Sequence, residues 1–429
     1  AHPFVALLIV SLLVAFATGI PADKIITTIE KGMGGLLGHI ASIIILGSML
    51  GVLIEISGGA ESLAKTLTGV LGSKRTIAAL TIVAFILGTP VFFEVGFIII
   101  IPLIYGFSKV AHMSPLKFGL PMAGVMLTVH VALPTHPGAA AAAGILHSDV
   151  GWLMLAGIGV SVVVGIVGYF VARSINQRHY HLSINVLEQQ QTAEVPDLSV
   201  NAQQTRLAPP NALVIGGLIV VPIVLIVSGT LCQALLLPEN AIRQLMTVIG
   251  TPPVALLISL GLASWTLGIR RGMNLKKLGE VTGSAIPSSA DVILVAGAGG
   301  AFGGVLVASG IGNALAEALE TIHLPLMPAA FLLSLVLRAS QGSATVAILT
   351  TSGLLSQAVA GLEPLQLVLV TLATCFGSLG LSHVNDAGFW VVTRYLGLSV
   401  PDGLKTWTVL TTIMGVTGFL ITWLLWFLL

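Results

Sequence analysis

Long apolar stretches separated by short polar connections run along the whole chain. Most have about the 20 residues that a helix needs to cross a bilayer. The stretches predicted to form such helices are residues 4–20, 36–56, 81–107, 152–171, 212–231, 254–269, 292–308, a stretch from 329 that continues past 343, and 407–429. Only 8% of the residues are charged and 55% are hydrophobic, against about 25% charged in soluble domains. The pattern therefore predicts an all-α polytopic membrane protein.

The basic residues predict how the chain is oriented in the membrane. With residues 173–210 and 269–280 in the cytoplasm, only Lys24, Lys31 and Arg243 fall outside, and Arg338 lies within an apolar segment. Such an excess inside is typical of membrane proteins, and it places the C-terminus on the opposite side from the central segment. The assignment requires that 81–107 and 328–360 each enter and leave the membrane on one side, as re-entrant hairpins. Two ordinary spans in each of these stretches would leave the following residues on the same side and remain an alternative.

A polar segment divides the chain into two halves that share a pattern. Residues 174–210, rich in Gln, Asn and Ser, predict a flexible cytoplasmic linker between a first half (1–173) and a second half (211–429). With a shift of 252 residues, Gly47 matches Gly299 and Gly51 matches Gly303. We therefore expect two repeats, and we expect them to be inverted, because the first span after the linker runs outward whereas the matching span of the first half would run inward. Because the span 212–231 has no counterpart before it, we also expect one N-terminal helix of the first repeat to be missing from this sequence.

Each half contains a hairpin broken near its middle and a helix interrupted by polar residues. The hairpin breaks lie at 88–90 and 340–343, and the helix breaks lie at 134–138 and 382–388. Proline removes a backbone donor, and a bilayer offers no water to replace the lost hydrogen bond. Paired discontinuous helices in inverted repeats point to a substrate site near the membrane midplane. The free amide groups of a broken helix also attract anions such as carboxylates.

Glycine, hydroxyl, amide and imidazole groups gather at these breaks, where they could contact a ligand. The expected substrate-binding residues are Thr89, Thr135, His136, Gly138, Ser343, Thr345, Ser382, His383 and Asn385. Any single Ser or Thr could instead bond to a carbonyl of its own helix. His130, one turn before a break, is expected to be a packed side chain. No metal site is predicted, because His383 and Asp386 lack further ligands at a recognisable spacing.

Two acidic residues deep in apolar segments are the candidate carriers of a coupled proton. Glu94 and Asp386 each follow a break, whereas Glu55 and Asp291 lie near predicted cytoplasmic ends and are expected to be structural. An ionisable group at the centre of a membrane helix costs about 2.5 kcal/mol or more, and desolvation favours the neutral carboxyl. The alternative for either residue is a permanent ion pair, with Arg338 as the obvious partner.

Four segments in order resemble the gluconate:proton symporter family of bacterial permeases. They are FFEVGFIIIIPL at 92–103, HPGAAA at 136–141, QGSATVAILTTSG at 341–353 and SHVNDAGFWVV at 382–392. The resemblance implies a scaffold domain, a mobile elevator-type transport domain, and uptake of a sugar acid with a proton across the bacterial inner membrane. The chain departs from the family at Thr135, Ala139 and Ala387, where proline is common. The departures leave open which sugar acid or hydroxy acid is carried.

Other functions remain open from the residues alone. A cation/proton antiporter would also use broken helices and buried acids, but it would have little need for the hydroxyl and imidazole groups beside them. A permease for another small carboxylate, such as a D-amino acid, fits equally well. An enzyme is not expected, because nucleophile–base and metal motifs are lacking. We expect no cofactor besides the proton and, at a net charge of +1, no nucleic-acid partner. The oligomeric state stays open, a homodimer included.

Overall fold

A computed structural model describes residues 3–72, 75–193, 209–311, 314, 317, 321 and 324–429. Nearly all of these residues are helical, and within these ranges no β-strand occurs. Seven helices in the described ranges are long and apolar enough to cross a membrane: Ala22–Ile56, Phe93–Val110, Pro115–Leu146, Val150–Ile175, Ala212–Leu235, Pro252–Arg271 and Val400–Trp426. The prediction of an all-helical, multi-pass membrane protein is confirmed.

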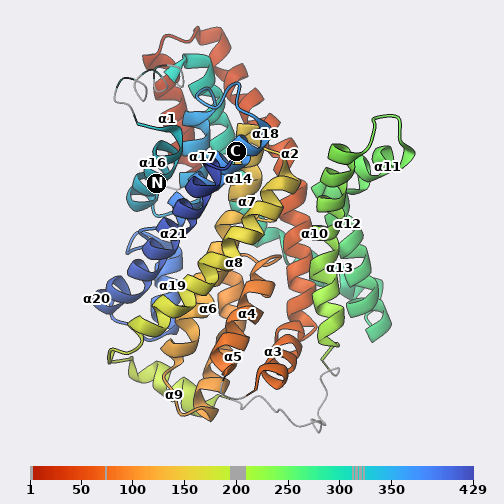
Figure 1. Cartoon of the computed structure of the whole chain (residues 1–429), viewed down its shortest axis with the longest axis vertical. Coiled ribbons are helices and arrows are strands. Elements are labelled where there is room, and N and C mark those ends of the chain that lie inside the picture. The colour runs from red at the N-terminus through yellow and green to blue at the C-terminus, as the bar shows by residue number, and fades with distance from the viewer. Residues whose placement is uncertain are drawn as a thin grey trace.

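The first half runs through a long helix and then a series of shorter ones (Figure 1). Its helices are α1 (Pro3–Ala17), α2 (Ala22–Ile56), α3 (Gly59–Leu71), α4 (Thr76–Gly88), α5 (Phe93–Val110), α6 (Pro115–Ala132), α7 (Pro137–Leu146) and α8 (Val150–Ile175). The α4–α5 and α6–α7 connections lie at the breaks that the sequence predicts at 88–90 and 134–138. At 35 residues, α2 is about 50 Å long and exceeds the hydrocarbon core of about 30 Å.

The linker contains α9 (Ile184–Thr192), and the second half follows it. The helices and short helical segments of the second half are α10 (Ala212–Leu235), α11 (Ala241–Ile249), α12 (Pro252–Ala263), η2 (Ser264–Gly268), η3 (Ile269–Arg271), α13 (Leu275–Gly283), α14 (Ile286–Ser309), α16 (Leu326–Gln341), α17 (Ala344–Leu355), α18 (Pro364–Leu379), α19 (Ala387–Tyr395), α20 (Val400–Gly403), η4 (Leu404–Thr408) and α21 (Val409–Trp426). Gly342 ends α16 in the left-handed conformation, at φ +79°, which glycine adopts without strain. The α16–α17 and α18–α19 connections again lie at predicted breaks.

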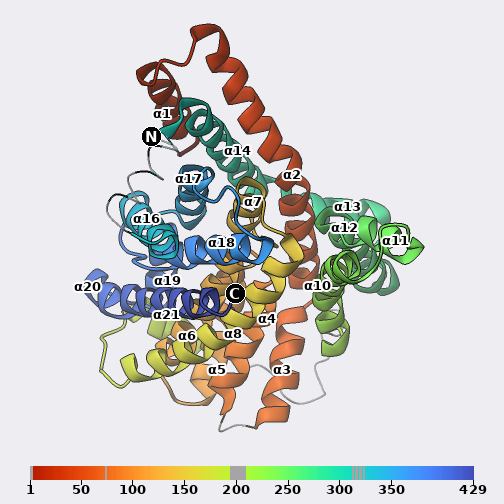
Figure 2. The same ribbon diagram turned by 45° about the horizontal axis from the view of Figure 1, so that its top comes forward.

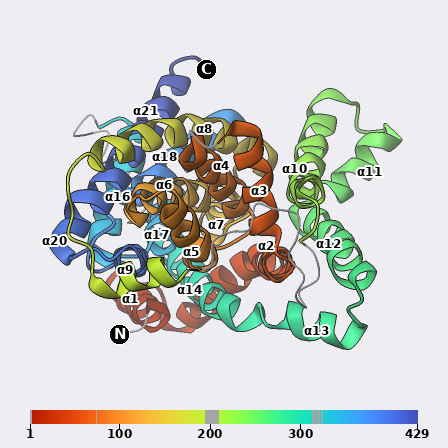
Figure 3. The same ribbon diagram turned by 90° about the horizontal axis from the view of Figure 1, so that it is seen from below.

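The helices form a central bundle with an arm on one side. Figures 1 and 3 show α10, α11, α12 and α13 projecting from the side of the bundle that α2 occupies. Helices α2 and α14 pack along each other (Figure 2). A Cβ on Gly32 would lie only 2.5 Å from Gly300 O, so glycine permits this close approach. The bundle interior is filled by fully buried side chains such as Phe97, Phe118 and Phe376.

Part of the predicted linker is helical and packs against the bundle. Val186 of α9 is buried, and the Gln190 amide donates to Ser108 Oγ (3.0 Å) and to Met113 O (2.8 Å). The Lys109 ammonium donates to Ala193 O at 2.9 Å. Residues 194–208 lie outside the described residues, so the flexible-linker prediction stays untested there. The α9 contacts hold the start of the segment against the end of α5.

Candidate functional site

In each half, the hairpin break contacts the helix break of the same half. In the first half, the buried His136 ring donates from Nε2 to Gly88 O at 2.7 Å. In the second half, the Asn385 amide donates to Ala339 O at 2.7 Å, and a side chain on Gly342 would collide with the backbone of Asn385. Each connection is therefore held to the neighbouring break by hydrogen bonds or close backbone contacts.

The breaks of the two halves also meet one another in the interior. A Cβ on Gly138, at the start of α7, would lie 3.6 Å from the Thr345 Cα at the start of α17. A Cβ on Gly388, at the start of α19, would lie 3.0 Å from a ring carbon of Phe93 at the start of α5. The N-termini of four half-helices therefore converge in the middle of the bundle.

A cavity of about 100 Å³ lies at this convergence. It is lined by Phe93, Glu94, Leu127, His130, Arg338, Gly342, Ser343, Ala344, Thr345, Asp386, Ala387 and Gly388. The first turns of α5, α17 and α19 all contribute to this lining. Since the first amide groups of a helix lack partners within the helix, each N-terminus carries a partial positive charge. The cavity is therefore suited to an anion.

A buried ion pair forms one wall of the cavity. The Arg338 guanidinium donates from Nη2 to Asp386 Oδ2 and from Nη1 to Gly342 O at 2.9 Å. Arg338 is 2% exposed and Asp386 is 4% exposed. Asp386 also accepts from the Ser382 hydroxyl and from Gly388 N–H at 3.0 Å, and so caps α19. Arg338 Nε is buried and has no hydrogen-bond partner among the described residues, which leaves one donor of this cation free.

Glu94 differs from Asp386 in its surroundings. It is half-buried in the first turn of α5 and lines the cavity. No described residue forms an ion pair with its carboxyl group. Of the two predicted proton carriers, Asp386 is therefore paired with Arg338, as in the ion-pair alternative, whereas Glu94 has no such pair among the described residues.

Two predicted binding residues, Ser343 and Thr345, line the cavity together with these charged groups. Ser343 Oγ accepts from Val346 N–H at 3.4 Å and caps α17. Thr345 is half-buried beside it. Both hydroxyl groups are therefore positioned where a ligand in the cavity could reach them.

The other predicted binding residues surround the breaks without lining this cavity. Ser382 donates to Asp386 and accepts from Trp407 Nε1 at 2.7 Å, and His383 donates to Ala339 O at 2.9 Å. Thr89 bonds back to Phe85 O at 3.3 Å, within its own helix. This outer set consists of Thr89, Thr135, His136, Gly138, Ser382, His383 and Asn385. Several of its members hold the connections in place.

Arg338 and His130 reach the cavity although the sequence did not single them out as ligand contacts. The His130 and His136 rings lie 4.7 Å apart, centroid to centroid. The Nδ1 atom of each is buried without a hydrogen-bond partner in the described part of the chain. Of the two, His130 lines the cavity. The only signal in the sequence was the presence of a cation and an imidazole within apolar segments.

Comparison with known proteins agrees with the motifs. Residues 1–428 match the family model described as GntP family permease. The chain is 61% identical over 425 residues to the inner membrane permease YgbN of Escherichia coli K12, covering 99% of this chain and 94% of that protein. It is 37% identical over 426 residues to a gluconate permease of Bacillus subtilis 168, covering 97% and 93%.

A solved structure also shares the fold. The chain resembles Neisseria gonorrhoeae MtrF, from a class of antimetabolite efflux pumps, with a TM-score of 0.68 at 13% identity over 98% of this chain and 94% of that one. At this identity the likeness establishes the fold alone. The family resemblance seen in the motifs is confirmed by the match over the whole chain, which places it among permeases and not among enzymes. The chain belongs to the GntP family of multi-pass membrane permeases.

Proposed function

We propose that this permease takes up gluconate, or a related sugar acid or hydroxy acid, by proton symport across the bacterial inner membrane. The observation that carries the proposal is the cavity where three helix N-termini and Arg338 meet an unpaired carboxyl group, Glu94. Relatives named gluconate permease and inner membrane permease support the substrate class and the location.

Each part of a sugar acid has a matching group in the cavity. The helix N-termini and the positive charge of Arg338 favour a carboxylate. Ser343, Thr345 and His130 provide groups that can hydrogen-bond to the hydroxyls of the substrate. A simple cation cannot accept hydrogen bonds from these donors, so the lining favours a hydroxylated anion over the cation of an antiporter.

The electrostatics of the cavity supply a reason for proton coupling. Arg338 and Asp386 neutralise each other, so the protonation state of Glu94 decides the net charge of the lining. A sphere of 100 Å³ is about 6 Å across, and two like charges at that distance repel by about 2.8 kcal/mol at an effective dielectric constant of about 20. Ionised Glu94 would therefore weaken carboxylate binding about 100-fold. By linkage, the bound substrate favours the protonated form of Glu94 by the same factor.

We further propose that the half-helices around the cavity move as a body against α2 and α14, as in an elevator. Glycines of these two helices face the half-helices. A Cβ on Gly51 would lie 3.1 Å from the Val91 side chain, and one on Gly299 would lie 3.0 Å from the Leu349 side chain. Because glycine has no side chain, these faces of α2 and α14 lie close to the half-helices and carry no projecting side chains that would block sliding. The linker is expected on the cytoplasmic side and the C-terminus in the periplasm, as the basic residues indicate.

Uptake of labelled gluconate into proteoliposomes tests the proposed function. An inward proton gradient should drive accumulation, a protonophore should abolish it, and unlabelled sugar acids should compete. A panel of six-carbon sugar acids, shorter hydroxy acids and D-amino acids would then identify the substrate class. Cation efflux coupled to proton entry, without carboxylate uptake, would contradict the proposal and indicate an antiporter. If D-amino acids were the only compounds that compete with labelled gluconate, the proposed substrate class would be wrong and D-amino acids would take its place.

A further inference from the structure

A second, larger cavity lies apart from the candidate site, at the end of the bundle where α6 begins and α8 ends. Its volume is about 740 Å³. Lys117, Arg173 and Arg178 contribute cationic side chains to its lining, and none of the described residues that line it is acidic. Lys117 and Arg173 are exposed, and neither forms an ion pair with a carboxylate of the described chain. The cavity therefore has an uncompensated positive charge.

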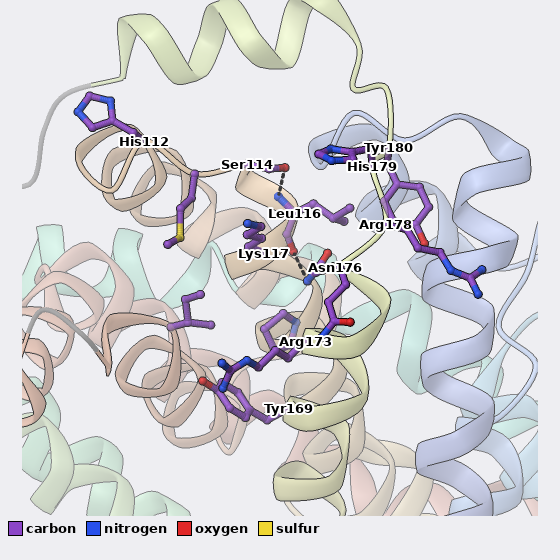
Figure 4. A pocket seen from close by; sticks show the side chains of 14 residues that line it. His112, Ser114, Leu116, Lys117, Tyr169, Arg173, Asn176, Arg178, His179 and Tyr180 are labelled. Atoms are coloured by element: carbon purple, nitrogen blue, oxygen red, sulfur yellow. Dashed lines mark hydrogen bonds between the residues drawn. The ribbon is translucent and has the colours of Figure 1, made fainter.

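Two helix features add to this charge and define its centre. Helix α6 starts here, with Ser114 as its cap, so the positive end of its dipole lies beside Lys117. Figure 4 shows Arg173 beside Tyr169 of α8 and Lys117 beside Leu116 of α6, whereas Arg178 extends away from both. Lys117 and Arg173 thus supply positive charge at two places in the lining.

An unpaired acceptor lies in the same cavity. The Asn176 amide donates from Nδ2 to Leu116 O at 3.4 Å, which orients the group. Its Oδ1 is buried and has no hydrogen-bond partner among the described residues. A buried acceptor without a donor is costly, and the side chains that cover this atom keep a ligand from reaching it. The Asn176 amide therefore joins the end of α8 to the start of α6, and the lining itself suits a ligand with an anionic group.

The outer face of α8 connects this cavity to the lipid. Val162, Ile166 and Phe170 are 44%, 54% and 59% exposed, and their spacing places them on one face of the helix. Arg173 follows on the same face. From Val162 to Arg173 the helix rises about 16 Å, which is about half of a hydrocarbon core of about 30 Å. The apolar face thus has the length of one leaflet, and the cations lie at headgroup depth.

We propose that this cavity binds the headgroup of an anionic phospholipid such as phosphatidylglycerol. Lys117 and Arg173 provide the positive potential that attracts its phosphate, and the acyl chains lie along the apolar face of α8. Basic cavities between membrane helices are suited to such headgroups. Free phosphate would interact with the cations alone and would make no use of the apolar face of α8.

Lipid binding to the purified protein in neutral detergent tests the proposal, with native mass spectrometry as the measurement. Phosphatidylglycerol should bind and phosphatidylcholine should not. Inorganic phosphate and glycerol 3-phosphate should fail to compete at matched concentrations. Because one cation near an anionic headgroup is worth about fivefold in binding, Lys117→Gln and Arg173→Gln should each weaken it about fivefold and the double variant about 30-fold.

A matched control removes two charges elsewhere. Lys276 and Lys277 of α13 are exposed and do not line the cavity, so Lys276→Gln/Lys277→Gln should leave phosphatidylglycerol binding unchanged. The single variants keep the test decisive if the double variant does not fold. An equal loss in the control would overturn the proposal, because it would reveal a general effect of charge. Full competition by inorganic phosphate would also overturn it and would indicate a soluble anion.

Discussion

Replacing Glu94 with Gln separates substrate binding from proton coupling. In the native protein, substrate affinity should fall as the pH rises, by up to about 100-fold, because ionised Glu94 repels the substrate carboxylate across the cavity. Glu94→Gln has the shape of the protonated residue and cannot release a proton. Its affinity should therefore be independent of pH and close to the low-pH value of the native protein. No described residue forms an ion pair with the Glu94 carboxyl group, so folding should be little affected.

Equilibrium binding of labelled gluconate to the purified protein, from about pH 5 to 9, measures this dependence. In proteoliposomes, the Glu94→Gln variant should retain counterflow of gluconate and lose accumulation driven by a pH gradient. Glu55→Gln is the matched control, because Glu55 is also half-buried in a membrane helix but does not line the cavity. Normal accumulation by Glu94→Gln, together with a native pH dependence of affinity, would refute the role of Glu94 and make Asp386 the candidate.

Three further predictions address the architecture of the site. Asp386→Asn and Arg338→Gln should each lower the free energy of unfolding by about 3–5 kcal/mol, because each leaves a buried charge unpaired. The double variant should lose less than the sum of the two single losses, which denaturant titration in detergent would measure. Additive losses would contradict the pairing. Gly299→Val should retain gluconate binding but lose transport, because the valine side chain would meet α17. Gly303→Ala should transport normally, because its Cβ would lie 3.9 Å from the nearest atom, the Cα of Gly353. Equal transport by the two variants would contradict sliding at this face. His136→Ala should destabilise the fold by about 1–3 kcal/mol, because a buried carbonyl loses its donor, with less effect on gluconate affinity than Arg338→Gln; the reverse order would place His136 in the binding site.

The sequence alone determined the membrane helices and the places where they are interrupted. Both are local properties: a run of about 20 apolar residues crosses a bilayer, and proline, glycine and short polar side chains interrupt a helix wherever they occur. The connections after Gly88 and Leu133, and the left-handed Gly342, follow directly from their residues. The motifs around these breaks also identified the family, because they are short, continuous stretches of chain.

Only the tertiary structure decided which polar groups face the cavity. Ser343 and Ser382 both lie at breaks, yet Ser343 lines the cavity and Ser382 is used to hold Asp386. The pairing of Asp386 with Arg338 joins residues 48 positions apart, and the sequence left it as one of two alternatives. Both outcomes depend on how helices that are far apart in the chain pack against each other. Packing sets the directions of the side chains, and the spacing of residues along one segment does not specify these directions. Glu94 stands out for the same reason, since only the packing of α5, α17 and α19 places it at the cavity without an ion-pair partner among the described residues.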